Sequence, residues 1–243
     1  MKTSDMGIIA LIGHEGIVPG PYFDGVGVLT AYVGHTKAAG GMDPADLPAG
    51  MPADLDAALR EVFRVFREDL AKFEAEVDRA ITVPVEQHEF DAAVSFHFNT
   101  GAIARADWVK KLNAGDRAGA AAAIMNWSKP ASIIGRRTEE QELFRDGVYP
   151  DDPITVWKVN ANKHVVWKAA RTLLPADALA LMKPEEVSVP EAEIAAPPEA
   201  PTEPEEDAPT LIAPPTQTPA APTGWLPRLL AFFSALLKGK PNA

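Results

Sequence analysis

The sequence predicts a mainly helical, two-lobed α+β domain with a small β-hairpin sheet, followed by a disordered Pro-rich linker and a hydrophobic C-terminal helix. Three observations lead to this prediction. A glycine-broken, β-favouring segment lies within residues 13–35. Apolar residues recur every three or four positions from residue 55, and further helical patterns continue to residue 147. From residue 184 the chain is rich in Pro, Ala, Glu and Thr and lacks the apolar content to fold.

The first predicted element is a short helix that precedes the glycine-broken segment. Ser4 is a suitable N-cap, and Gly16 is placed to end the helix just after Glu15. Its apolar face consists of Ile8, Ile9, Leu11 and Ile12. A carboxylate at a helix C-terminus among apolar neighbours is disfavoured in its ionised form. We therefore expect Glu15 to keep a proton available, as a general acid requires.

A β-hairpin is predicted next. Residues 19–21, Pro-Gly-Pro, are expected to break the chain, and Tyr22 and Phe23 favour a strand. Asp24-Gly25, with a further glycine at 27, indicates a hairpin turn, and residues 28–33 form the return strand. Such a hairpin could bring Asp24 and Thr30 opposite Glu15. The three groups would then leave room for a sugar ring and a water.

Helices account for the next hundred residues, after a loop at 40–52. Residues 55–81 predict one long amphipathic helix with Asp54 as its cap. Beyond Pro84 we expect a helix over 85–98 that ends at Asn99-Thr100-Gly101. Shorter helices follow over 108–113 and 116–127, and a last one runs over 136–145 and stops at Gly147.

The remaining residues divide into three parts. Residues 154–167 read as a small hairpin around Asn160–Lys163, with a helix over 168–182 behind it. The linker at 184–223 holds nine of the acids and no base. Trp225–Leu237 is almost wholly apolar, but its roughly 20 Å as a helix falls short of the ~30 Å hydrocarbon core of a membrane. We expect this segment to lie at a membrane surface, or to dock on the enzyme or a partner.

Composition excludes several classes of function. The chain has no cysteine, so disulfides, thiolate metal sites and a cysteine nucleophile are absent. Its net charge is −11 and its basic residues form no stripe, so no nucleic-acid partner is indicated. Potential metal ligands are not clustered, and neither a metal nor a cofactor is expected. The apolar run at 7–13 is too short and too soon charged for a signal peptide.

Several segments carry a resemblance to a known family. Glu15, Asp24 and Thr30 lead into Gly34-His35 and resemble the catalytic segment of the phage-type lysozymes, glycoside hydrolase family 24. SFHFNTGAI at 95–103, WVKKLNAGD at 108–116 and GRRTEEQELFRDG at 135–147 are similar to the helical lobe of that family. The resemblance covers about residues 4 to 148. It implies a lysozyme-like fold.

The resemblance also implies an activity. The enzyme would hydrolyse the β-1,4 bond of peptidoglycan between N-acetylmuramic acid and N-acetylglucosamine. Glu15 would protonate the leaving oxygen, and Asp24 and Thr30 would hold the water or stabilise the cationic centre. By resemblance, inversion is the favoured course. The expected protein is a monomeric endolysin, made in the host cytoplasm and released through a membrane pore to lyse the cell.

Substrate contacts are expected at positions that also have structural interpretations. Asn99 could bind an N-acetyl or hydroxyl group of a sugar or cap a helix. His35 could contact substrate, act as a second acid, or pin the lobe junction through a carboxylate. Arg137, like Arg136, could reach substrate carboxylates or form local ion pairs. The full set of expected substrate-binding residues is Tyr32, His35, Phe98, Asn99, Gly101 and Arg137.

We expect four parts in the chain: a catalytic domain at 1–148, an accessory hairpin plus helix at 149–183, the linker at 184–223, and the apolar helix at 224–243. Two other functions remain open. A lytic transglycosylase would cut the same bond and leave anhydro ends. A non-catalytic module would bind the cell wall while the tail disrupts membranes. Use in phage entry rather than release is a further alternative.

Overall fold

The computed structural model describes residues 1–183, and the expected linker and apolar tail lie outside this range. The chain begins with helix α1 (Asp5–Glu15) and a three-stranded antiparallel sheet in the order β1-β2-β3. Its strands are β1 (Val18–Phe23), β2 (Leu29–Tyr32) and β3 (His35–Thr36). The α+β class and the first hairpin are therefore confirmed.

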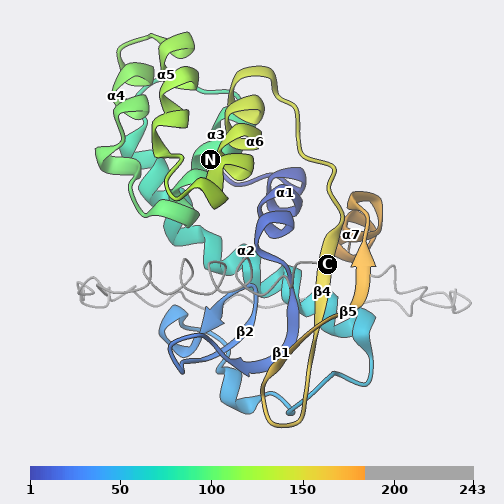
Figure 1. Ribbon diagram of the computed structural model, residues 1–243. Coiled ribbons are helices and arrows are strands. Elements are labelled where there is room, and N and C mark those ends of the chain that lie inside the picture. The colour runs from blue at the N-terminus through green and yellow to red at the C-terminus, as the bar shows by residue number, and fades with distance from the viewer. Residues whose placement is uncertain (184–243) are drawn as a thin grey trace, which may run out of the picture. The chain divides into compact units, whose positions relative to one another are not determined.

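Helices dominate the middle of the chain, as predicted. They are α2 (Leu55–Ala80), α3 (Gln87–Thr100), α4 (Asp107–Asn113), α5 (Arg117–Ile124) and α6 (Ile134–Asp146). Figure 1 shows α3 to α6 gathered at one end and the first sheet at the other, with α2 running between them. At ~1.5 Å per residue, the 26 residues of α2 span roughly 40 Å, enough to join two lobes.

Caps fix the ends of the helices that carry the site. The Ser4 hydroxyl accepts a hydrogen bond from Gly7 N at 3.0 Å and starts α1, and Asp54 caps α2 in the same way through Ala57 N. Left-handed glycines end α3 at Gly101 and α6 at Gly147. The sequence-based boundaries of these helices are thus accurate to within a few residues.

Residues 149–183 complete the same core. Here β4 (Ile154–Val159) pairs with β5 (Val165–Leu173), and α7 (Pro175–Met182) follows. Ile154, Leu173 and Leu181 belong to the hydrophobic cluster that also contains α1 and α2. A smaller cluster joins β4 to β1 through Val18, Tyr22 and Val159.

Two predictions about secondary structure are wrong. Residues 19–21 do not break the chain but lie within β1, where the pairing with β2 shifts register and tolerates proline. Gly20 is required there because an added Cβ would lie 2.3 Å from the Gly50 carbonyl oxygen. Residues 168–173 are strand rather than helix, because pairing with β4 overrides their helix propensity. Pro175 then stands at the start of α7, where a helix tolerates it.

Candidate active site

Glu15 is the last residue of α1, and its side chain is buried, with 8% of the residue exposed. Gly16 ends the helix with φ +70° and ψ 172°, a conformation open essentially to glycine alone, and donates to the Ile12 carbonyl at 2.7 Å. This turn directs the chain from α1 straight into β1. The carboxyl group therefore sits where the helix meets the sheet.

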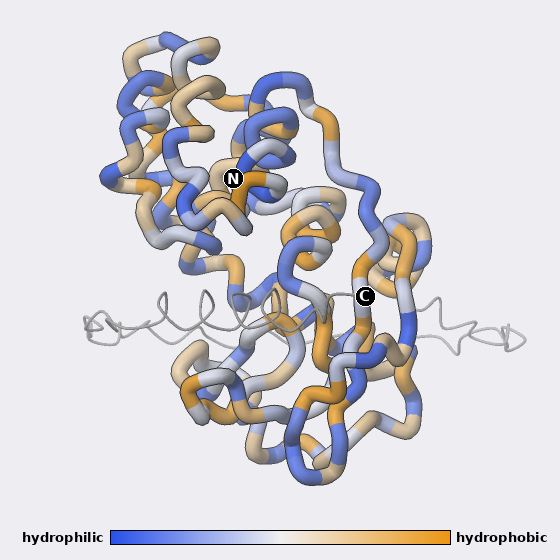
Figure 2. Tube along the Cα trace, in the orientation of Figure 1, coloured by the Kyte–Doolittle hydropathy of each residue, from blue (hydrophilic) through white to orange (hydrophobic). Residues whose placement is uncertain are grey.

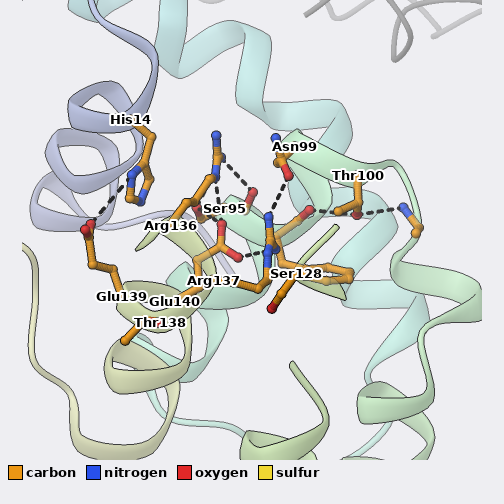
Figure 3. A network of polar contacts seen from close by, with 12 residues as sticks. His14, Ser95, Asn99, Thr100, Ser128, Arg136, Arg137, Thr138, Glu139 and Glu140 are labelled. Atoms are coloured by element: carbon orange, nitrogen blue, oxygen red, sulfur yellow. Dashed lines mark hydrogen bonds and ion pairs between the residues drawn. The ribbon is translucent and has the colours of Figure 1, made fainter. Parts of the chain in front are cut away.

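A buried arginine from α6 holds the Glu15 carboxylate. Arg136 Nη1 donates to Glu15 Oε1 at 2.5 Å, and Arg136 Nε donates to Glu140 Oε1 at 2.9 Å. Figure 3 shows Arg136 beside Glu140 and Ser95. Burial lowers the pKa of Arg136, but the charges of the Glu15 and Glu140 carboxylates outweigh burial, so the pKa lies above its ordinary value. Glu15 is thus paired with a cation, whereas the sequence led us to expect only apolar neighbours.

Asp24 occupies the turn after β1 and organises it. Its Oδ1 accepts hydrogen bonds from Val26 N at 3.0 Å and from Val28 N at 2.8 Å. These contacts close a local side-chain-to-backbone turn. The carboxylate is half-buried and fixed in position without a cationic partner among the residues described.

Thr30 and Tyr22 face each other across the hairpin. They are directly paired between β1 and β2, and both side chains are buried. The Thr30 hydroxyl donates to the Val28 carbonyl at 3.0 Å. Burial raises the pKa of Tyr22 far above its ordinary value, and the charges of Asp24 and then Glu15 raise it further. Tyr22 thus lies within the influence of both carboxylates, although sequence reasoning treated it only as a strand residue.

The structure does not bring Tyr32 and His35 into this cluster. Tyr32 is buried in the core, and burial followed by the charge of Glu61 raises its pKa. His35 Nδ1 lies 2.8 Å from Asp69 Oδ2 on α2, and Nε2 lies 2.8 Å from the Met42 carbonyl. His35 therefore ties the sheet to α2, which is its structural alternative, and Tyr32 is part of the hydrophobic core.

The helical-lobe candidates are largely packed. Phe98 lies against Phe73, with ring centroids 4.9 Å apart, and Gly101 is the left-handed cap of α3. Arg137 is fully buried, with its guanidinium 5.1 Å from the Phe96 ring centre. Arg137 Nη2 donates to Asn99 Oδ1 at 2.6 Å, and Arg137 also pairs with Glu140 (Figure 3). Asn99 and Gly101 are half-buried, so they retain some exposed surface.

A small cavity of about 60 Å³ lies between α1 and residues of the 139–152 segment. His14 and Glu139 line it, with His14 Nδ1 3.6 Å from Glu139 Oε2 (Figure 3). Burial, with help from the nearby Arg136 and Arg137 cations, holds the pKa of His14 well below its ordinary value. Within residues 1–183, no group of three His, Cys, Asp or Glu side chains is arranged to hold a metal ion. In the same range, no helix is both long and apolar enough to cross a membrane.

Comparison with known proteins places these residues in a family. Residues 13–140 match the model of the phage lysozyme family. The chain is 35% identical over 148 residues to an endolysin of Acyrthosiphon pisum secondary endosymbiont phage 1, which covers 60% of this chain and 92% of the relative. It is 38% identical over 147 residues to the SAR-endolysin of Escherichia phage Mu, covering 56% of this chain and 76% of the relative.

A solved structure agrees with the sequence relatives. The endolysin of Escherichia coli phage FAHEc1 superposes with a TM-score of 0.52 at 30% identity and covers 62% of this chain and 97% of the other. The matched residues 13–140 include the end of α1, the first hairpin and most of the helical lobe, and so contain Glu15, Asp24 and Arg136. The chain belongs to the phage lysozyme family and is a muramidase of the endolysin type, a hydrolase of peptidoglycan.

Proposed function

We propose that Glu15, Asp24 and Thr30 carry out the hydrolysis of the β-1,4 bond between N-acetylmuramic acid and N-acetylglucosamine. Glu15 gives its proton to the leaving oxygen, Asp24 and Thr30 hold the attacking water, and Asp24 takes the proton that the water loses as its oxygen bonds to the sugar carbon. The observation that supports this assignment is that residues 13–140, which contain all three side chains, match the phage lysozyme family, and that the β1–β2 pairing puts Thr30 opposite Tyr22, two residues before Asp24. Two carboxyl groups flanking one bond are the usual apparatus of glycoside hydrolysis.

Arg136 has a positioning role in this proposal. Its guanidinium contacts Glu15 Oε1, so we assign Oε2 to the leaving oxygen. A bound glycan strand expels water from the site, which strengthens the contacts that orient the Glu15 carboxyl group. The buried hydrogen bonds of Arg136 to Glu140 and to the Ser95 carbonyl keep the guanidinium in place throughout.

Asp24 and Thr30 are arranged to accept hydrogen bonds from a water molecule. Asp24 uses Oδ1 for the turn, and we assign Oδ2 to the water. The Thr30 hydroxyl donates its proton to the Val28 carbonyl, so its oxygen is left as an acceptor. Both groups would thus orient the water with its lone pair toward the sugar carbon. We propose that Asn99 and Gly101 line the opposite, helical side of the substrate.

The test is a pair of variants of the full chain assayed on purified, membrane-free peptidoglycan. Glu15→Gln keeps an oxygen for Arg136 but has no acidic proton, and we expect clearance to fall roughly 10²- to 10⁴-fold. Glu68→Gln is the matched control, since Glu68 is 61% exposed on α2, and it should clear the wall normally. Substantial activity of Glu15→Gln would overturn the assignment.

Mass analysis of the released ends separates hydrolysis from transglycosylation. Reducing ends are expected, whereas 1,6-anhydro ends would mean that the muramic hydroxyl attacks in place of water. Polarimetry or NMR of fresh product would then report the anomer, with inversion as the expected course.

We also propose that the protein is a monomer that reaches the wall from the host cytoplasm through a membrane pore. Residues 225–237 would contact the membrane surface during that passage. Expression in a bacterial cytoplasm with and without a separate pore-forming protein tests this route. Rapid lysis without the pore former would refute it.

A further inference from the structure

The β4–β5 hairpin is joined by hydrogen bonds to the strand that links Glu15 to Asp24. Ile17 N donates to the Thr155 carbonyl at 2.9 Å, and Trp157 N donates to the Ile17 carbonyl at 2.7 Å. At the far end of β1, Phe23 N donates to the Lys163 carbonyl at 3.0 Å. Figure 1 shows the hairpin running beside β1. This hairpin lies beyond residues 13–140, the part that matches the family.

The β4–β5 hairpin carries a pair of tryptophans next to the turn at Gly16, which follows Glu15. The rings of Trp157 and Trp167 meet edge to face, with centroids 5.5 Å apart, and Trp167 is 52% exposed. An added Cβ on Gly16 would lie 2.9 Å from Trp157 Nε1, so the indole covers the residue that follows Glu15. The tryptophan pair therefore lies against the turn that follows Glu15. Tryptophan offers a broad apolar face of the kind on which the C–H groups of a sugar ring stack.

The charge of the hairpin is opposite to that of the whole chain. Between residues 154 and 173 there is no acid, and the basic residues are Lys158, Lys163, Lys168 and Arg171. Arg171 pairs with Asp56 on α2, which fixes one edge of the hairpin. Figure 2 shows hydrophilic residues around the hairpin tip. In a chain of net charge −11, the hairpin is thus a segment of net positive charge that also carries the aromatic pair.

We propose that the β4–β5 hairpin is an additional peptidoglycan-binding platform that extends the substrate site beyond the family's catalytic cleft. Trp167 stacks on a sugar ring of the glycan strand, and Lys158 and Lys168 attract the carboxylates of its stem peptides. The ligand is a polymer that alternates sugar rings with acidic peptides, which matches tryptophans flanked by lysines. The proposal rests on the proposed function, because it takes the same polymer as substrate.

The experiment measures binding separately from hydrolysis. Full-length protein carrying Glu15→Gln is mixed with membrane-free sacculi, and the bound fraction is measured with and without Trp167→Ala. We expect the affinity for sacculi to fall about 5- to 10-fold, as for the loss of one aromatic contact. Trp167→Phe should restore most of the binding, and Lys168→Glu should weaken it independently.

Val166→Ala is the matched control, because Val166 is 40% exposed on the same strand, and it should bind normally. In the otherwise wild-type chain, Trp167→Ala should raise KM on sacculi more than it lowers kcat, whereas Val166→Ala should change neither. The proposal is overturned if sacculus binding is unaffected by Trp167→Ala and Lys168→Glu, or if Val166→Ala lowers it equally. It is also overturned if these variants lose only binding to anionic lipid vesicles. Activity of Glu15→Gln would instead refute the catalytic assignment and leave this binding result standing.

Discussion

Removal of the Arg136 guanidinium should strongly destabilise the protein. In Arg136→Met the side chain keeps its bulk but loses contacts to Glu15 at 2.5 Å and to Glu140 at 2.9 Å. Glu140 still has Arg137 and the Ser95 hydroxyl, which donates to it at 2.8 Å. Glu15, in contrast, is left as a buried carboxylate at the negative end of a helix.

The cost follows from this loss of charge compensation. Breaking a buried ion pair by removing one partner typically costs about 3–5 kcal/mol. For a domain of this size, about 2–4 °C per kcal/mol corresponds to a Tm lower by roughly 6–20 °C. Thermal unfolding of the full chain, followed by circular dichroism, measures the change.

Two further variants make the result specific. Arg64→Met removes an arginine that also has two carboxylate partners, Glu61 and Glu68, but is 53% exposed on α2. Its expected cost is below about 1 kcal/mol, because water screens exposed pairs. Adding Glu15→Gln to Arg136→Met should recover stability, since the uncompensated charge is gone. Equal Tm losses for Arg136→Met and Arg64→Met would refute the reasoning.

Two other predictions concern the pH dependence of stability and the turn at Gly16. Burial lowers the pKa of His35, but the Asp69 hydrogen bond and the Met42 carbonyl raise it above the ordinary 6.5. The stabilisation that protonated His35 contributes to the fold is therefore complete below about pH 6.5. It is lost as pH rises through the higher pKa that His35 has in the folded state. Urea unfolding across this range should show the decline, and Asp69→Asn should abolish it. Gly16→Ala should lower the free energy of unfolding by about 1–3 kcal/mol and reduce activity, because alanine is strained at φ +70° and its Cβ meets Trp157. Gly13→Ala should instead raise the free energy of unfolding by up to about 1 kcal/mol, because an added Cβ at this position of α1 meets nothing within 4 Å. Similar unfolding midpoints for the two glycine variants would contradict this account.

Local sequence patterns predicted most of the fold, because most of its elements are specified locally. The period of apolar residues and the Asp54 cap defined α2 almost to the residue. Residues 168–173 were misjudged because their helix-favouring composition yields to pairing with β4. Pro19 and Pro21 were misjudged because a strand with a register shift tolerates them.

In the candidate site too, features set by nearby residues could be predicted from the sequence, whereas contacts between distant residues could not. Glu15 and Asp24 were identified from residues close to them in the chain. The partner of Glu15 could not be predicted in this way, because Arg136 is 121 residues away and the adjacent arginines at 136 and 137 look equivalent in sequence. The fold separates them: Arg136 meets Glu15, whereas Arg137 turns to Asn99 and Glu140. No periodicity distinguishes these two orientations.

The hydrogen bonds between β1 and the second hairpin set the order in which the enzyme matures. Ile17 is made early in translation, but its partner Thr155 emerges about 140 residues later, a contact of very high sequence separation. At roughly 5–20 residues per second, the segment that begins at Ile17 waits on the order of ten to thirty seconds for its second hydrogen-bonded neighbour. During that interval it presents unpaired backbone groups, as an edge strand does. A ribosome-bound chain therefore carries Glu15, Asp24 and Thr30 well before the candidate site around them is complete.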